Sequence, residues 1–133
     1  MCSAKQKQRQ KRMKVELSER EGVNLLVLYG RIGPLECRAM QKALGQLVSD
    51  NKLRIAVGLS DVTYLDSTAL GILVATMKST RTRGGDLRLF GLSDIVMDIF
   101  RITRLYSVFE ILPTMEDAIT SFSEGGNGDR PPL

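Results

Sequence analysis

Histidine and tryptophan are absent from the 133 residues of the chain. The missing histidine removes the commonest general base of enzymes, the commonest nitrogen ligand of metal ions and any phosphohistidine relay. The only two cysteines, Cys2 and Cys37, match neither a disulfide framework nor a metal site in number or spacing. Carboxylates alone can still support catalysis, but these absences favour a binding protein over an enzyme.

Long apolar runs are absent as well. No run approaches the 18 or so apolar residues that a membrane-spanning helix needs, and no apolar stretch follows the basic N-terminus as in a secretory signal. We therefore expect a cytoplasmic protein that does not enter a membrane. The apolar fraction of 43% is ordinary for a globular chain of this length, and it is enough for one core.

The positive charge of the chain is concentrated at its N-terminus. The net charge is +4, but six basic residues precede the first acid, Glu16, so the rest of the chain is slightly negative. A basic tail can attract nucleic acid or an anionic membrane. We favour a solvated, disordered extension over residues 1–13, because it has no aromatic residue to stack on bases. The Gly- and Pro-rich residues 123–133 predict a second flexible tail, which leaves one domain over 14–122.

Between the tails, strand and helix patterns alternate. Strands are expected at 13–17, 23–29, 54–59, 87–90 and 108–112, with a turn at 21–22 and loops at 30–34 and 61–65. Helices are expected from Pro34 to about 49, from Ser67 to about 83, after Ser93 or Asp94, and after Pro113-Thr114. This order predicts an α/β fold: a single domain with a mostly parallel mixed sheet of about five strands and four helices, its first hairpin antiparallel.

The segment 61–71 is the most informative part of the sequence. It leads from a strand into a helix, and Asp66, Ser67 and Thr68 are all suitable N-cap residues, so an ordinary helix cap is one interpretation. The helix that follows, however, has little charge. Its core face is expected to hold Leu70, Leu73, Val74 and Met77, while the other faces hold Thr68, Ala69, Ile72, Ala75 and Thr76, with no charge before Lys78.

An uncharged outer face with one exposed isoleucine suits close approach of a partner, although loops of the chain itself could also cover it. A hydroxyl at the start of this helix is well placed for a switch. Free backbone N–H groups and the helix dipole favour an anion there, so a phosphate on Ser67 would not unfold the domain. Its roughly −1.5 to −2 charges would still repel a partner packed on the uncharged face.

This segment resembles the signature of the STAS domain family (sulfate transporter and anti-sigma factor antagonist), and in particular that of the bacterial anti-anti-sigma factors. The signature is usually Asp-Ser-(Ser/Thr)-Gly-Leu-Gly at a strand-to-helix junction, where this chain has Asp66-Ser67-Thr68-Ala69-Leu70-Gly71. The resemblance continues through the Gly-Gly pair at 84–85, the apolar pattern at 100–105 and the segments 109–111 and 116–118. It covers about 15–122, essentially the whole expected domain.

The resemblance implies a partner switch and no catalysis by this chain. The unphosphorylated protein would bind an anti-sigma factor that is an ATP-dependent serine kinase, phosphorylation of Ser67 would end the contact, and a serine phosphatase would restore it. ATP and magnesium would belong to the kinase, no cofactor is implied for this chain, no nucleic acid is contacted directly, and the free protein is expected to be a monomer. The implied contact residues are Asp66, Ser67, Thr68, Ala69, Leu70, Gly71, Ile72, Ala75 and Thr76.

The chain departs from the family pattern at three positions. Ala69 replaces the usual glycine of the signature. Gly58 stands where the family often has Asp or Asn on the central strand, and Gly33 stands in a loop where an acid is common. Those family side chains lie near the phosphoacceptor, so the departures bear on phosphorylation more than on binding.

Two other hypotheses stay open. One is a non-catalytic STAS subunit of a larger assembly, such as the accessory of a lipid-transport ATPase or a stress-sensing complex, in which Ser67 is a cap or a contact. The other is a small phosphatase or nucleotide hydrolase that uses Asp61 or Asp66, since ligand sites are common at strand ends. The sequence has no phosphate-binding glycine loop of the Walker type to support this last hypothesis.

Overall fold

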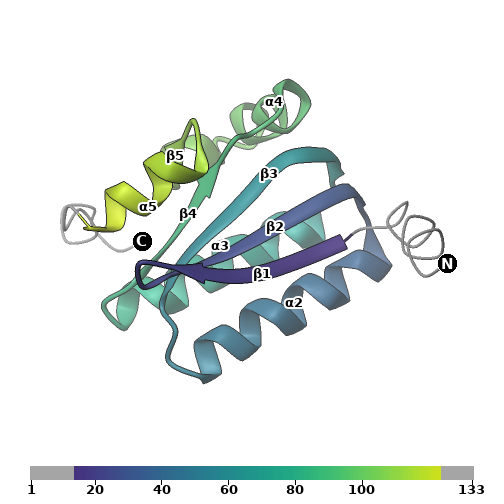
Figure 1. The fold of residues 1–133 in the computed structure, drawn as a ribbon. Helices are drawn as coiled ribbons and strands as arrows, with labels where there is room; N and C mark the ends of the chain where they lie inside the picture. The colour runs from purple at the N-terminus through teal and green to yellow at the C-terminus, as the bar shows by residue number, and fades with distance from the viewer. Residues whose placement is uncertain (1–13, 124–133) are drawn as a thin grey trace, which may run out of the picture.

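The computed structural model describes residues 14–123 (Figure 1). The tails expected at 1–13 and 123–133 lie outside the described residues, apart from Ser123, which ends the last helix. The elements follow in chain order as β1 (Lys14–Arg20), β2 (Val23–Ile32), α2 (Pro34–Ser49), β3 (Arg54–Leu65), α3 (Ser67–Thr82), β4 (Asp86–Phe90), α4 (Asp94–Ile102), the 3₁₀ helix η1 (Leu105–Ser107), β5 (Ile111–Leu112) and α5 (Met115–Ser123).

The five strands form one sheet in the order β1-β2-β3-β4-β5. The β1–β2 pair is antiparallel and the other three pairs are parallel. The hairpin turns at Glu21 and Gly22, which both have positive φ (53° and 81°), as the tight turns that match strand twist require. The predicted fold class, strand number, helix number and antiparallel first hairpin are confirmed.

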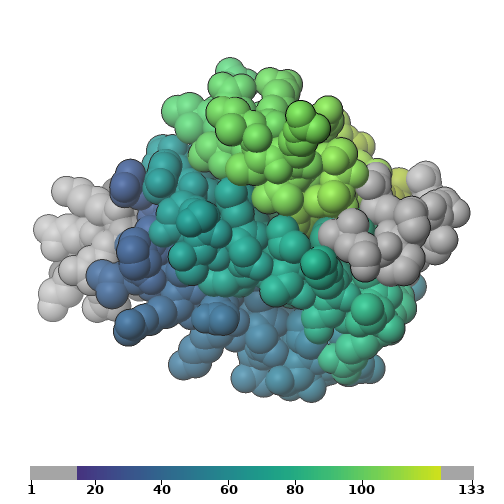
Figure 2. Space-filling view, turned by 180° about the vertical axis from the view of Figure 1, so that it is seen from behind, coloured from purple at the N-terminus to yellow at the C-terminus, as the bar shows by residue number. Residues whose placement is uncertain are grey.

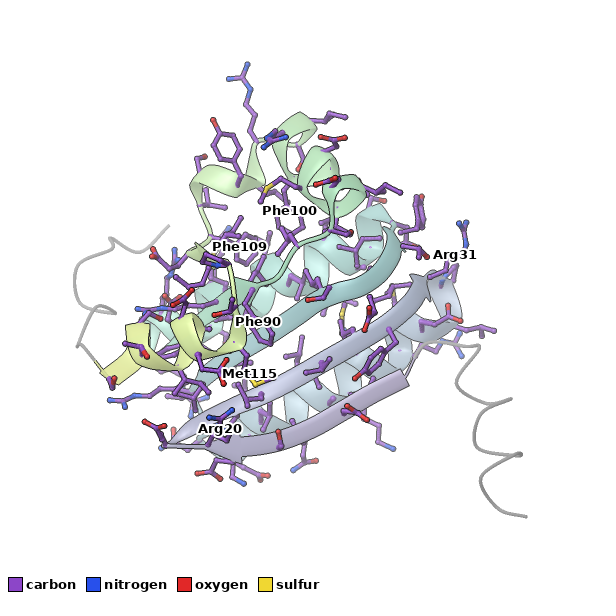
Figure 3. All side chains as sticks on the ribbon, turned by 45° about the horizontal axis from the view of Figure 1, so that its top comes forward. Arg20, Arg31, Phe90, Phe100, Phe109 and Met115 are labelled. Carbon is purple, nitrogen blue, oxygen red and sulfur yellow. The ribbon has the colours of Figure 1, made fainter. Side chains whose placement is uncertain are left out.

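Helices cover both faces of the sheet. Figure 1 shows α2 and α3 on one face and α5 on the other. The larger core lies under α2, α3 and α4, where Phe100 and Phe109 pack edge to face with ring centroids 5.7 Å apart. The smaller core lies under α5 and includes Phe90 and Phe122. Figure 3 shows Phe90 on the α5 side of the sheet, separate from the Phe100–Phe109 pair near α4.

Strand β3 is longer than predicted. The expected loop at 61–65 is wrong, because the strand continues to Leu65 and β2 continues to Ile32 beside it. The register between these strands shifts twice, once before Tyr29 and once before Arg31. At each shift β3 contains one residue more than the paired segment of β2. Such bulges break the two-residue alternation by which a strand is recognised in a sequence. The extension carries the end of β3 to the start of α2.

The last strand is shorter than predicted. Of the expected strand at 108–112 only Ile111 and Leu112 pair with β4. Residues 108–110 lie in a turn that follows η1, and η1 itself begins after Arg104 in the left-handed conformation (φ 65°). Within this turn Phe109 is buried and packs against Phe100 of α4.

The C-terminal end of α3 is held by a buried ionic cluster. Asp86 on β4 accepts from Arg81 Nε on α3 at 2.7 Å and from Arg88 Nε at 3.0 Å, and all three side chains are at most 5% exposed. Arg81 Nη2 also donates to the Val108 carbonyl at 3.0 Å, and Arg88 Nη1 donates to Ser121 Oγ on α5 at 2.7 Å. One carboxylate therefore joins α3, β4, the segment after η1 and α5.

Candidate functional site

Ser67 is the first residue of α3, directly after the end of β3. Of the three candidate N-cap residues, the structure assigns the cap to Asp66, whose Oδ1 accepts from the Ala69 backbone N–H at 2.9 Å. This satisfies one of the free N–H groups at the helix start. Ser67 and Thr68 are not used as caps and are exposed, so the Ser67 hydroxyl is accessible at the positive end of the helix dipole.

The start of α2 lies against this junction. The Asp66 backbone N–H donates to the Ile32 carbonyl at 3.3 Å, which extends the contact between β2 and β3 by one residue. Cys37, in the first turns of α2, donates through Sγ to Asp66 Oδ1 at 3.5 Å. Burial raises the pKa of the Cys37 thiol to about 11, and its hydrogen bond to Asp66 adds to the shift. The thiol is therefore protonated at neutral pH and acts as a donor.

Sequence reasoning missed this role of Cys37. It assigned the residue only to a helix and excluded a disulfide, and the structure has Cys37 as a free, buried thiol. The contact with Asp66 joins residues 29 positions apart, so periodicity within α2 could not reveal it. The structural reason is the link from β2 to α2, which is the single residue Gly33 where the sequence predicted a loop over 30–34, and which places the first turns of that helix beside the end of the neighbouring strand.

The outward face of α3 forms a low ridge between two shallow grooves. We call this ridge, which contains Gly71 and Ala75, the crest. Gly71 and Ala75 are exposed and line both grooves. The first groove, about 440 Å³, runs between α3 and η1 and includes Ser67, Leu105 and Thr103 in its lining. The second, about 450 Å³, runs between α3 and α2. Figure 2 shows the residues of α3 in teal between α2 in blue and the α4–η1 segment in green.

The composition of the outward face differs from the prediction in two residues. Ala69 is 0% exposed and packs in the larger core, so its assignment to an outer face is wrong. Ile72 is partly buried against the same core and is not an exposed isoleucine. A helix that lies flat on a sheet buries a wider stripe than the four positions expected. No described loop covers Thr68, Gly71 or Ala75, which are exposed.

The implied contact residues therefore fall into two layers. Ser67, Thr68, Gly71 and Ala75 are exposed, and Ile72 and Thr76 are partly so. Thr76 turns its hydroxyl inward to the Ile72 carbonyl at 2.8 Å. Asp66 is half-buried, and Leu70 is 8% exposed. Asp66, Leu70 and Ala69 form the second, more buried layer, which supports the exposed residues from beneath.

The surroundings of Gly58, where the family pattern often has Asp or Asn, differ from those of Gly33, where an acid is common. A Cβ on Gly58 would lie 2.5 Å from Cζ of Phe90, so the Phe90 ring occupies the space of any side chain there. A Cβ on Gly33 would lie at an ordinary 3.5 Å from Glu36 Oε1. That same oxygen accepts from the Gly33 N–H at 3.1 Å at the start of α2. A side chain at 58 would therefore require the Phe90 ring to move, whereas one at 33 meets only an ordinary contact.

The two aspartates considered for a hydrolase lie apart. Asp61 pairs in register with Tyr29 of β2, and its charge helps to raise the pKa of Tyr29, after the larger effects of the hydrogen bond to Glu16 and of burial. Asp66 lies five residues further along the extended strand, roughly 15 Å away at the backbone. The Asp66 carboxylate already accepts from Ala69 and Cys37. The structure does not bring these two carboxylates together as an acid–base pair.

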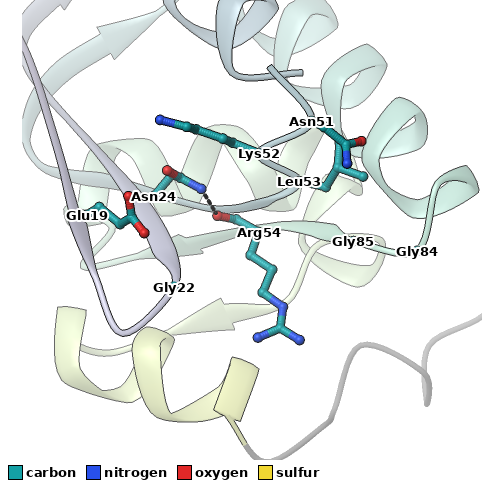
Figure 4. Close-up of a pocket in the computed structure, with 9 residues that line it drawn as sticks. All are labelled: Glu19, Gly22, Asn24, Asn51, Lys52, Leu53, Arg54, Gly84 and Gly85. Carbon is teal, nitrogen blue, oxygen red and sulfur yellow. Dashed lines mark hydrogen bonds between the residues drawn. The ribbon is translucent and has the colours of Figure 1, made fainter. Parts of the chain in front are cut away.

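A polar hollow lies at the opposite end of the sheet from Ser67 (Figure 4). Its volume is about 350 Å³, and Asn24 Nδ2 donates to the Arg54 carbonyl at 3.1 Å inside it. The lining contains one carboxylate, Glu19, and no hydroxyl or thiol. Over residues 14–123, no cluster of three acidic or cysteine side chains is arranged to hold a metal ion. In the same range, no helix has the length and apolarity to cross a membrane.

Fold and site together define a small α/β domain with an exposed serine at a strand-to-helix junction. The STAS domain model matches residues 14–118, and the chain belongs to the STAS domain family. It is 34% identical over 98 residues to an anti-sigma-B factor antagonist of Listeria monocytogenes, a match that covers 73% of this chain and 86% of the relative. It is 31% identical over 106 residues to that of Bacillus subtilis, covering 79% and 95%.

A solved structure shares the fold. A putative anti-sigma factor antagonist from Thermotoga maritima superposes with a TM-score of 0.76 at 22% identity, covering 80% of this chain and 92% of that one. Both sequence relatives are named as antagonists of an anti-sigma factor. The family that the signature at 66–71 resembles is thereby confirmed.

Proposed function

We propose that the chain is an anti-sigma factor antagonist that binds an anti-sigma factor serine kinase and is released when that kinase phosphorylates Ser67. The observation that carries the proposal is the placement of Ser67. It is exposed, it starts α3, and it lines the groove that follows the uncharged crest of that helix. A group added to its hydroxyl therefore changes the surface that a partner would contact and not the core.

The chemistry of the switch suits this position. The terminal phosphoryl group of ATP is transferred to Ser67 Oγ: the new O–P bond forms, the bond from that phosphorus to the bridging oxygen breaks, ADP leaves and the hydroxyl proton goes to a base of the kinase. The first turn of α3 contains no acidic residue, so beside the N-cap carboxylate of Asp66 the added charge meets the free N–H groups and the helix dipole, which favour an anion. The fold tolerates the phosphate, whereas a partner packed on an uncharged face does not.

The contact surface that we propose is the crest and its margins. Ser67, Thr68, Gly71 and Ala75 would touch the partner directly, with Ile72 and Thr76 at the edge. Asp66, Ala69 and Leu70 would shape this surface from below. The small side chains of the crest let a partner approach the helix backbone closely, and Lys78 is the first charged residue it would meet along α3.

Release and recovery complete the cycle. A serine phosphatase would hydrolyse the phosphoester on Ser67 and return the binding form. ATP and magnesium would be held by the kinase, so we assign no cofactor and no catalysis to this chain. We place the exchange in the cytoplasm, with the free antagonist as a monomer and without direct contact to nucleic acid.

Affinity capture from a lysate of the native host tests the proposal. The baits are the wild type, Ser67→Ala, Ser67→Asp and Ser18→Asp, the last a control that adds the same charge at an exposed serine of β1. Mass spectrometry should identify an ATP-binding anti-sigma factor with the wild type, Ser67→Ala and Ser18→Asp, and at least tenfold less of it with Ser67→Asp.

Equal capture of that protein by all four baits would refute the switch. Stable capture of a transporter ATPase or of a large complex, unaffected by Ser67→Asp, would instead support the accessory-subunit hypothesis. In that case Ser67 only forms part of the helix start, and the proposal that its phosphorylation regulates binding is wrong.

A further inference from the structure

We propose that Cys37 is a positioning residue for Ser67: its thiol, fixed on α2, holds the Asp66 carboxylate and thereby sets the backbone from which the Ser67 hydroxyl projects. The inference rests on the proposed phosphorylation of Ser67 and adds a residue that the signature at 66–71 does not contain. It assigns a functional task to a cross-helix contact between the starts of α2 and α3.

The geometry around Asp66 supports this assignment. Its backbone N–H is bound to the Ile32 carbonyl of β2 at 3.3 Å. Its Oδ1 accepts two hydrogen bonds, from the Ala69 N–H of its own helix at 2.9 Å and from Cys37 Sγ of the neighbouring helix at 3.5 Å. Asp66 is thus fixed by three different elements. Ser67 is the next residue, so its position is determined by the same contacts.

The thiol itself is held firmly. Cys37 is 3% exposed, and its backbone N–H donates to the Gly33 carbonyl at 2.9 Å, which closes the first turn of α2. Only Gly33 separates that helix from the end of β2. Because the β2–α2 link is so short, the position of the thiol relative to Asp66 follows from the sheet. A protonated thiol whose position is fixed in this way is suited to orienting a carboxylate.

Transfer of a phosphoryl group is more sensitive to such positioning than binding is. Displacing a reacting atom by about 1 Å can cost on the order of 100-fold in rate, whereas Gly71 and Ala75 of the proposed contact surface lie one to two turns further along α3 and keep their positions. Loss of the thiol donor should therefore lower kcat for phosphorylation of Ser67 and leave KM unchanged. We expect a decrease of about three- to tenfold, because Asp66 still keeps its bonds to Ala69 and Ile32.

The test compares Cys37→Ala, Cys37→Ser and Ile119→Val with the wild type. Serine keeps a donor at position 37, alanine removes it, and Ile119→Val lowers stability from the smaller core on the opposite face of the sheet. Each protein is phosphorylated with magnesium ATP by the purified anti-sigma factor that the wild type captures. Amide hydrogen exchange of residues 66–70 is measured on the free proteins.

The expected result has three parts. Cys37→Ala loses kcat three- to tenfold at unchanged KM and exchanges the Ala69 amide faster, Cys37→Ser recovers at least half of the wild-type kcat, and Ile119→Val changes neither. An unchanged kcat in Cys37→Ala overturns the inference even if exchange is faster, and so does an equal loss in Ile119→Val. If the wild type itself is not phosphorylated on Ser67, the proposed function fails first and the inference fails with it.

Discussion

The two ends of α3 are held by different kinds of contact. At the C-terminal end, Asp86 pairs with two buried arginines, Arg81 and Arg88, and so links four segments of the chain. At the N-terminal end, a single oxygen of Asp66 accepts two hydrogen bonds, and the next residue is exposed. The comparison shows how one helix can be anchored strongly at the end that carries no proposed function. The other end presents the exposed hydroxyl of Ser67, whose replacement we expect to change the free energy of unfolding little.

The largest effect is expected when the buried cluster of Asp86, Arg81 and Arg88 is broken. Asp86→Asn leaves Arg81 and Arg88 buried without a counter-charge, which should lower the free energy of unfolding by about 3–5 kcal/mol. The matched control is Asp98→Asn, which breaks an exposed pair with Arg101 and should cost less than about 1 kcal/mol. Urea unfolding followed by circular dichroism measures both. Similar losses in the two variants would show that the buried cluster around Asp86 contributes no more to stability than an exposed ion pair does.

The dependence of stability on pH tests the contact between Cys37 and Asp66 at the N-terminal end of α3. The Cys37 thiol has an ordinary pKa of 9.0, and burial raises it to about 11 in the folded chain. Between these values the unfolded state binds fewer protons than the folded state, so stability is fully present below pH 9 and falls as the pH rises to 11. Relative to Cys37→Ser, the wild type should lose on the order of 2 kcal/mol across this window.

Urea unfolding at intervals from pH 8 to 11, under reducing conditions, provides the measurement. The Cys37→Ser protein retains Tyr29 and every lysine, so subtracting its curve removes their titration. Parallel curves for the two proteins would mean that the thiol ionises as easily in the folded chain as in the unfolded one, and that it is no firm donor to Asp66.

The smallest expected effect compares the same charge at both ends of the helix. Ser67→Asp adds an anion near the positive end of the dipole and should raise stability by less than about 1 kcal/mol, whereas Thr82→Asp at the negative end should lower it by a similar amount. Thermal unfolding at low ionic strength resolves the difference, and added salt should reduce it. A loss of stability in Ser67→Asp would contradict the claim that the fold tolerates a phosphate there.

Most of the fold could be predicted from the sequence, because its signals are local. The turn at 21–22, the helix start at Pro34 and the glycines after α3 mark where elements change. The errors arose where a contact between segments overrides the local pattern. The bulges of β3 depend on pairing with β2, and the turn before β5 contains Phe109, which is buried against Phe100 of α4, far from it in the local sequence pattern.

The candidate site was predictable only in part, for a similar reason. Ser67 could be identified because N-cap residues and an uncharged helix are visible in the sequence. The burial of Ala69 depends on how α3 lies on the sheet, and the role of Cys37 depends on a neighbouring helix. The ionic cluster around Asp86 gave no signal either, because Arg81, Asp86 and Arg88 look like ordinary surface charges until β4 is placed in the interior of the sheet.

The Phe90 ring above Gly58 also restricts the order in which this chain can change. Any side chain at position 58, including the aspartate or asparagine that the family pattern often has there, collides with that ring. A smaller residue at position 90 would have to come first, and it would leave a cavity in the α5 core until position 58 was filled. Each single step costs stability that the double change recovers. The effects of changes at positions 58 and 90 on the free energy of unfolding are therefore expected to be non-additive, because the two positions share one space in the α5 core.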